Sequence, residues 1–315
     1  MGSEILSPLS APEPESAGSE QAVVRSTEPS PASQEQPLWA RLSVTDWIVL
    51  VCLLVLFGPM FHALYALWSD PQAPQAYGLL ILPAALALVW MMRSRLVGVP
   101  VQPAHAGLIP TALGIGCLLL GTTINALTIS GFGFVLTIWG VVLTRYGWPV
   151  VKKLWFPLGF LLAMVPLPHE FLNVITFPLQ GISVKGAALL LTPLGDVMTR
   201  GTRIFLHNYT LDVVAPCSGL TIVLPLFVLS LYYLYMVDAP LWKKGILVLL
   251  TIPVAMAVNA VRVALIGVVG EFYGATAADT FHDYSGLITV AAGFAVLILI
   301  AQEIKCSHIS EEITL

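Results

Sequence analysis

The chain has few charges of either sign, and so lacks the polar surface that a soluble domain needs. Of its 315 residues, 10% are Asp, Glu, Lys or Arg and 57% are hydrophobic. Soluble domains carry about 25% charged residues, so this composition excludes an ordinary soluble domain and indicates a polytopic membrane protein. The net charge is -4 and the basic residues are scattered, which excludes nucleic acid as a partner.

Cysteine is also scarce. The four cysteines form no Cys-x-x-Cys pair, so the sequence predicts neither a disulfide framework nor a zinc site. Cys52, Cys117 and Cys306 lie in or beside apolar segments or near the chain end, and we interpret them as packing residues or unpaired surface thiols. Cys217 is left as the candidate for chemistry.

Long apolar segments account for most of the chain and predict an all-α fold with about eight transmembrane helices. The segments are 46–68, 77–92, 107–127, 131–148, 154–168, 218–237, 245–270 and 285–304. We therefore expect a transmembrane domain at 45–305 and a short cytoplasmic tail at 306–315.

Residues 1–44 have a different composition, rich in Ser, Pro, Glu, Gln and Ala and without an apolar period. Such a segment cannot bury enough surface to fold, so we predict a disordered cytoplasmic tail. It has no basic region followed by a short apolar core, which argues against a cleaved signal peptide.

The basic residues predict the orientation. With a cytoplasmic N-terminus, ten fall on the cytoplasmic side, three fall outside and Arg262 lies within the membrane. The ten are Arg25, Arg41, Arg93, Arg95, Arg145, Lys152, Lys153, Lys243, Lys244 and Lys305; the three are Lys185, Arg200 and Arg203. The positive-inside rule thus places both termini inside, and it places Cys217 and a loop at 271–284 on the outer face of the membrane.

About fifty residues on the outer face separate the fifth and sixth segments. Residues 171–194 carry apolar positions at helical spacing with polar residues between them, which is typical of an amphipathic helix that lies at the interface or re-enters the protein. Two short β-prone runs then flank residues 207–210, which are rich in turn formers. This pattern predicts a small hairpin near the site, whose second strand leads to Pro216 and Cys217.

Cys217, Arg262 and His282 are the candidate catalytic residues. A thiol at a helix N-terminus favours the thiolate, although a lone cysteine is more often a small buried hydrophobe. Arg262 lies within an apolar segment, where a charged residue usually has a functional role; a structural salt bridge or snorkelling is the alternative. His282, expected in the loop before the last segment, could serve as the base, and Arg262 could stabilise an oxyanion.

Three further residues are candidates for supporting roles. Asn259 lies one helical turn before Arg262, where it could orient the guanidinium or simply make an interhelical hydrogen bond. Asp283 could orient the ring of His282. Ser218 directly follows the cysteine.

Over residues 110–304 the sequence resembles the exosortase/archaeosortase family of membrane transpeptidases. The likeness is carried by Pro166-Leu167-Pro168, by Pro216-Cys217-Ser218-Gly219-Leu220, by Asn259-Ala260-Val261-Arg262-Val263, and by His282 before the final segment. Pro216 departs from the pattern, in which another small residue such as Ala is frequent. The resemblance implies a Cys217, Arg262 and His282 active site. It also implies substrates that are exported proteins with a C-terminal sorting signal made of a short motif, a transmembrane helix and a basic cluster.

These observations together predict a membrane cysteine transpeptidase that cleaves such signals on the outer face and transfers the protein to an unidentified acceptor, such as a lipid or envelope component. No metal or organic cofactor is implied. Two alternatives remain open. One is a transporter or lipid-binding membrane protein that holds an anionic group with Arg262, and the other is an intramembrane protease that releases its product to water.

Overall fold

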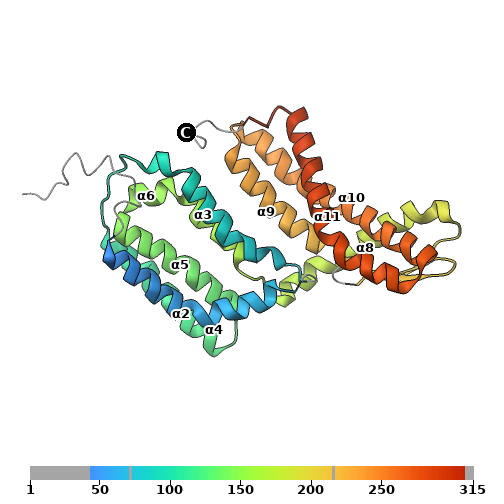
Figure 1. Cartoon of the computed structure of the whole chain (residues 1–315), viewed down its shortest axis with the longest axis horizontal. Helices are drawn as coiled ribbons and strands as arrows, with labels where there is room; N and C mark the ends of the chain where they lie inside the picture. Colours follow the sequence, from blue (N-terminus) through green and yellow to red (C-terminus); the bar gives the residue numbers. More distant parts are fainter. Residues whose placement is uncertain (1–42, 71–72, 215–216, 309–315) are drawn as a thin grey trace, which may run out of the picture.

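The structure, a computed structural model, describes residues 43–70, 73–214 and 217–308, and most of them are helical (Figure 1). The α-helices are α2 (Val44–Trp68), α3 (Ile81–Met91), α4 (Leu108–Thr123), α5 (Leu127–Tyr146), α6 (Trp148–Lys153), α7 (Trp155–Phe160), α8 (His169–Leu191), α9 (Leu220–Met236), α10 (Leu241–Tyr273) and α11 (Ala275–Glu303). The 3-10 turns are η2 (Ala76–Leu80), η3 (Arg93–Leu96), η4 (His105–Gly107), η5 (Leu161–Met164) and η6 (Thr192–Leu194). The prediction of a polytopic all-α protein is confirmed.

The predicted count of eight membrane helices is not confirmed. Within the described residues, six helical segments are long and apolar enough to cross a membrane, and three apolar helices are shorter. One of the six is His169–Leu194, the segment expected to be an interfacial amphipathic helix. It has only a few polar positions in its long apolar stretch, so its length and composition also fit a membrane span.

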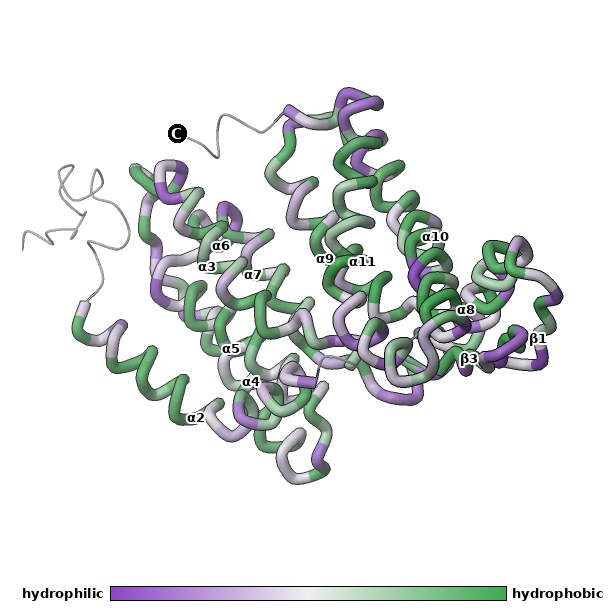
Figure 2. The backbone as a smooth tube through the Cα atoms, turned by 45° about the vertical axis from the view of Figure 1, so that its right-hand side comes forward, coloured by the Kyte–Doolittle hydropathy of each residue, from purple (hydrophilic) through white to green (hydrophobic). Residues whose placement is uncertain are grey.

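The helices form two groups that are consecutive in sequence (Figure 1). The first group contains α2 to α7, and its core is built around Phe57, Leu64 and Phe134. The second contains α8 to α11. Apolar residues cover most of the helical surface, while polar residues gather at the two ends of the bundle (Figure 2). This distribution is typical of helices whose sides face lipid.

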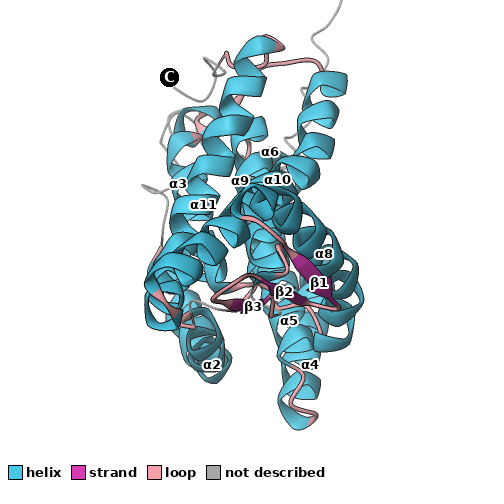
Figure 3. Ribbon diagram, turned by 90° about the vertical axis from the view of Figure 1, so that its right-hand side faces the viewer, coloured by secondary structure: helices cyan, strands magenta, loops and turns pink. Residues whose placement is uncertain are grey.

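A small antiparallel sheet lies beside α8 and α10, with strand order β1-β2-β3 (Figure 3). The strands are β1 (Met198–Arg200), β2 (Arg203–Phe205) and β3 (Thr210–Asp212), and Ile204 of β2 is paired with Leu211 of β3. The predicted hairpin is thus present as β2 and β3, and β1 adds a strand that the sequence pattern did not predict. Buried Ile204 and Leu211 fix the face of the sheet that packs on the bundle.

The predicted loop at 271–284 is wrong. Helix α10 runs to Tyr273 and α11 begins at Ala275, so Gly274 alone joins two long helices. Gly274 has φ +86, a conformation that favours glycine and lets the chain reverse at one residue. His282 therefore lies inside α11, because the helix continues well beyond the apolar stretch that hydropathy detects.

The predicted tails fall mostly outside the described residues, namely all of 1–42 and 309–315. Where the C-terminal end is described, it packs on the bundle. Cys306 is fully buried with Leu234 and Leu247, and Asp238 N donates to the carbonyl oxygen of His308 at 2.8 Å. The described start of the predicted C-terminal tail is therefore part of the packed structure.

Candidate functional site

Cys217 lies in a tight turn immediately before α9. Its backbone N–H donates to the carbonyl oxygen of Val214 at 2.8 Å, and Gly219, at the N-terminus of α9, has φ +96. A Cβ at Gly219 would lie 3.2 Å from the amide nitrogen of Asn259 and 3.1 Å from the sulfur of Met256. Glycine thus allows both the turn and its close approach to α10. Pro216, which is part of the motif, lies outside the described residues.

Two helices hold the backbone of this turn through buried side chains. Asn259 Nδ2 of α10 donates to the carbonyl oxygen of Cys217 at 3.1 Å and to Ser183 Oγ at 2.9 Å. Ser183 Oγ of α8 donates to the carbonyl oxygen of Ser218 at 3.0 Å. Because two successive carbonyls are bound from different helices, the position of the cysteine depends on how α8 and α10 pack.

The expectation that Asn259 orients the guanidinium of Arg262 is wrong, since no hydrogen bond joins the two side chains in the described structure. The other interpretation, an interhelical hydrogen bond, is confirmed by the Ser183 contact. Ser218 contributes its carbonyl oxygen, and its hydroxyl accepts a long 3.4 Å bond from Leu220 N. Both Asn259 and Ser218 are fully buried.

Arg262 is almost fully buried and reaches across to α11. Its Nε donates to Ser285 Oγ at 2.9 Å, and its Nη2 donates to the backbone carbonyl oxygen of His282 at 3.1 Å. No ion pair joins it to an acidic residue of the described chain, which counts against the structural salt bridge. Its Nη1 is buried and has no hydrogen-bond partner. Two nitrogens of the guanidinium are therefore bound to α11, and the third, Nη1, has no hydrogen-bond partner.

The backbone carbonyl oxygen of His282 accepts from Arg262, but the imidazole ring of His282 makes no contact with the guanidinium in these hydrogen bonds. Its Nδ1 lies 3.4 Å from Asp283 Oδ1, a long contact to a side chain that is 60% exposed. Its Nε2 is buried without a partner. No hydrogen bond joins the ring to the Cys217 thiol, although the neighbouring Phe281 packs in the same apolar cluster as Cys217. The pairing of His282 with Cys217 expected from the sequence is therefore not formed by a hydrogen bond in the described structure.

The electrostatics of the thiol differ from the expectation. Burial raises the pKa of Cys217 above its usual value, and the positive charge of Arg262 opposes this rise without overcoming it. A raised pKa lowers the thiolate fraction at neutral pH, which is opposite to the direction expected for a thiol at a helix N-terminus. Cys217 is only 3% exposed, so little water is available to stabilise the charged form of the thiol.

The hairpin that leads to Cys217 is fastened to the end of α10. The carboxylate of Glu271 accepts from the backbone N–H of Asn208 at 2.9 and 3.0 Å. The ring of Tyr209 packs where a Cβ at Gly270 would lie only 2.3 Å from its nearest carbon. On the other side, the amide of Gln180 in α8 donates to the carbonyl oxygen of Val213. Four residues after Val213, the chain reaches the cysteine.

Sequence reasoning missed several of these positioning residues. Ser285 follows His282 by three positions, so helical spacing on α11 could have indicated it. Ser183, Tyr209 and Glu271 have no comparable signal, because their partners lie far away in sequence. Cys52, Cys117 and Cys306 are free thiols like Cys217. In the described part of the chain, no group of three His, Cys, Asp or Glu side chains could hold a metal ion.

The fold and site define a class: a polytopic helical membrane protein with a buried cysteine and a buried arginine close enough for their charges to interact. A family model described as transmembrane exosortase matches residues 67–299, and the chain belongs to this family. Comparison with curated proteins and with solved structures finds no match. Membership in the family supports a general role as a membrane transpeptidase or protease.

Proposed function

We propose that this protein is a cysteine transpeptidase that cleaves the C-terminal sorting signals of exported proteins. The signal consists of a short motif, a transmembrane helix and a basic cluster, and the cleaved protein passes to an acceptor in the envelope. Cys217 is the nucleophile, His282 moves protons, and Arg262 stabilises the oxyanion.

One observation carries this proposal. Two polar atoms of the proposed catalytic residues, Arg262 Nη1 and His282 Nε2, are buried without hydrogen-bond partners, and the charge of Arg262 acts on the Cys217 thiol. An unsatisfied buried polar group costs about 1–3 kcal/mol, so such groups are usually kept for a ligand or a reaction. A donor that can hold a negative oxygen and a ring nitrogen that can exchange a proton are the two groups that a thiol nucleophile needs.

The reaction then follows from these groups. The Cys217 thiol loses its proton to His282 Nε2 and its sulfur attacks the scissile carbonyl, whose oxygen takes the negative charge against Arg262 Nη1. Collapse of this intermediate breaks the C–N bond, and His282 returns the proton to the leaving amine. The protein is left as a thioester on Cys217, which a nucleophile of the acceptor resolves.

Substrate has to open the site before this can occur, because Cys217 is buried in the described conformation. Val213 and Phe281 pack in the same apolar cluster as Cys217. Entry of a peptide between them would bring the carbonyl to the thiol while still excluding bulk water.

The direct test is processing in cells. An exported protein from the same genome, ending in a short motif, an apolar helix and an Arg-rich cluster, is co-expressed with the chain and followed by gel shift. We expect Cys217→Ser to abolish processing and Cys117→Ser, a half-buried cysteine of α4, to retain it. Normal processing by Cys217→Ser would reject the thiol mechanism and favour a transport or lipid-binding role.

Mass spectrometry of the processed protein separates transfer from hydrolysis. Transpeptidation leaves a new C-terminus bonded to an acceptor group, whereas a protease leaves a free carboxylate. A free carboxylate on all of the product would show that water, not an acceptor, resolves the thioester.

Orientation is part of the proposal, with the site on the outer face of the inner membrane. Single cysteines placed at exposed Thr199 in β1 and exposed Gln302 in α11, in a chain whose four native cysteines are all replaced by Ala, report the two ends. We expect an impermeant maleimide to label Thr199→Cys in intact spheroplasts and Gln302→Cys only after permeabilisation. The reverse pattern would place the site in the cytoplasm.

A further inference from the structure

A basic hollow lies at the end of the bundle opposite the Cys217 site. It has a volume of about 650 Å³ and is lined by Arg95, Val97, Gly98, Val99, Pro100, Pro149, Lys152 and Lys153. The lining comes from η3, from the loop that follows it, and from the short helix α6. Of these described residues three are cationic and none is acidic, so the hollow carries a concentrated positive charge.

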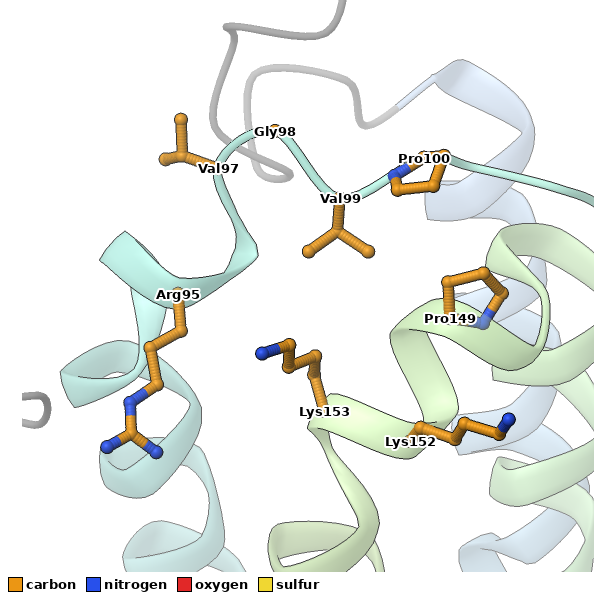
Figure 4. A pocket seen from close by; sticks show the side chains of 8 residues that line it. All are labelled: Arg95, Val97, Gly98, Val99, Pro100, Pro149, Lys152 and Lys153. Atoms are coloured by element: carbon orange, nitrogen blue, oxygen red, sulfur yellow. The ribbon is translucent and has the colours of Figure 1, made fainter.

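Figure 4 shows how the cations are placed. Lys153 extends toward the space between Arg95 and the loop at Val99, while Arg95 and Lys152 lie to either side with their charged ends turned outward. Lys153 therefore faces the hollow directly, and exposed Lys152 reaches the same space by a change of rotamer, which is fast at an exposed position.

Lys152 and Lys153 differ from other basic residues at this end of the bundle in their hydrogen-bond and ion-pair partners. Arg145 Nε binds Asp46 Oδ1 at 2.7 Å, and Lys243 Nζ donates to the carbonyl oxygen of Lys305 at 3.3 Å. Lys152 and Lys153 make no hydrogen bond or ion pair with any described residue. Their charges therefore have no partner within the described protein.

Exposed tryptophans place the hollow at the level of lipid headgroups. Trp148 lies at the start of α6 and is 53% exposed, and Trp155 lies just after α6 and is 58% exposed. Trp90, at 62% exposure, stacks under the guanidinium of Arg93 at 4.9 Å. Tryptophan and basic residues gather in this way where helices leave the hydrocarbon core.

An apolar surface adjoins the hollow on its membrane side. Trp155 packs edge-on against Tyr235 of α9, whose ring stacks on Phe156 at 3.9 Å between centroids. Arg95 lies close enough to Tyr235 for its charge to act on the phenol. An amphiphile held by Lys153 at its charged head would thus have aromatic side chains beside its apolar chains.

We propose that this hollow binds the phosphodiester headgroup of an anionic phospholipid. Three cations at the interface with an adjacent aromatic face match a ligand that has one negative phosphate and acyl chains. A free phosphate would make no use of the aromatic face, and a basic peptide would be repelled. Basic pockets at helix ends commonly bind such headgroups, each cation contributing about 1 kcal/mol. The site is distinct from Cys217 and does not depend on the proposed reaction.

The chain offers a matched test, because it has two adjacent lysine pairs at the same end. Lys152→Gln/Lys153→Gln removes two charges from the hollow, and Lys243→Gln/Lys244→Gln removes two charges outside it. The purified full chain, in neutral detergent, is titrated with phosphatidylglycerol or phosphatidylcholine, and bound lipid is counted by native mass spectrometry.

We expect phosphatidylglycerol to bind more tightly than phosphatidylcholine. We expect the affinity for phosphatidylglycerol to fall about 10- to 30-fold in Lys152→Gln/Lys153→Gln. It should fall less than about twofold in Lys243→Gln/Lys244→Gln. Lys152→Arg/Lys153→Arg, which keeps both charges, should bind normally and shows that the site tolerates substitution; size-exclusion chromatography verifies the fold of each variant.

Three outcomes would overturn the proposal. Equal losses in both lysine pairs would show general surface attraction. Equal binding of the two lipids would show that the negative charge is not recognised. Displacement of phosphatidylglycerol by millimolar inorganic phosphate would show a site for a free anion instead of a lipid.

Discussion

Asn259 Nδ2 of α10 donates to the backbone carbonyl oxygen of Cys217 at 3.1 Å, so this side chain holds the backbone of the proposed nucleophile. The same nitrogen donates to Ser183 Oγ, and Asn259 Oδ1 remains buried without a partner. The cysteine is thus located by a contact that spans three segments of the chain, which makes its geometry sensitive to changes that leave every catalytic group in place.

Asn259→Ala should slow processing strongly while Cys217, Arg262 and His282 remain. The substitution removes the donor to the Cys217 carbonyl and to Ser183, and a small displacement of a nucleophile lowers its rate about 100-fold. Processing of the co-expressed substrate measures the effect. Thr251→Ala is the control, because Thr251 in the same helix makes a buried 3.1 Å hydrogen bond to Ser230 of α9, away from the site. Equal losses in both variants would indicate general destabilisation.

Arg262→Lys should reduce the processing rate about 10²–10³-fold, as loss of an oxyanion donor does in other enzymes. Arg262 uses Nε and Nη2 to bind α11 and leaves Nη1, the proposed oxyanion donor, without a partner, whereas a single ammonium cannot serve both geometries. Ser285→Ala, which removes only one anchor, should lose much less. A lysine variant with near-normal processing would show that the arginine supplies charge alone.

The pH dependence of Cys217 alkylation should follow its raised pKa. In a chain with the other three cysteines replaced by Ala, reaction with a membrane-permeant maleimide should fade at a higher pH than for free glutathione, because less thiolate is present at any given pH. Since Arg262 favours the thiolate, Arg262→Gln should move the profile to still higher pH. Efficient alkylation well below neutral pH, in the absence of substrate, would contradict this assignment.

Gly270→Ala should loosen the hairpin. Its new methyl group would lie 2.3 Å from the Tyr209 ring, and overpacking of this kind costs about 1–3 kcal/mol. We expect lower thermal stability in detergent and slower processing. The loss in stability should shrink when Tyr209→Ala is added, because the clash is then removed.

Gly245→Ala is the matched control for this experiment. Gly245 lies in the same helix, and a Cβ there has no atom within 4 Å, so the substitution should leave stability unchanged or slightly higher. A Gly270→Ala chain as stable as the Gly245→Ala chain would show that Tyr209 does not depend on this contact.

The sequence by itself determined the class of the protein and its candidate chemistry. Long apolar segments require helices, because a backbone in lipid must satisfy its own hydrogen bonds. Short-range patterns also predicted the β2 and β3 hairpin. The residues Cys217, Arg262 and His282 stand out since thiol, charge and imidazole are rare in so apolar a chain.

Only the tertiary structure decided how these residues are arranged. Hydropathy could not show that α11 begins at Ala275. The first turns of this helix are held by backbone hydrogen bonds and by the turn at Gly274, and they do not require apolar side chains. Nor could hydropathy pair Asn259 with Cys217 or Arg262 with Ser285, since those contacts follow from how α8, α10 and α11 pack. Burial of Cys217 is likewise a property of the packed bundle. It raises the pKa of the thiol, whereas a helix N-terminus would lower it.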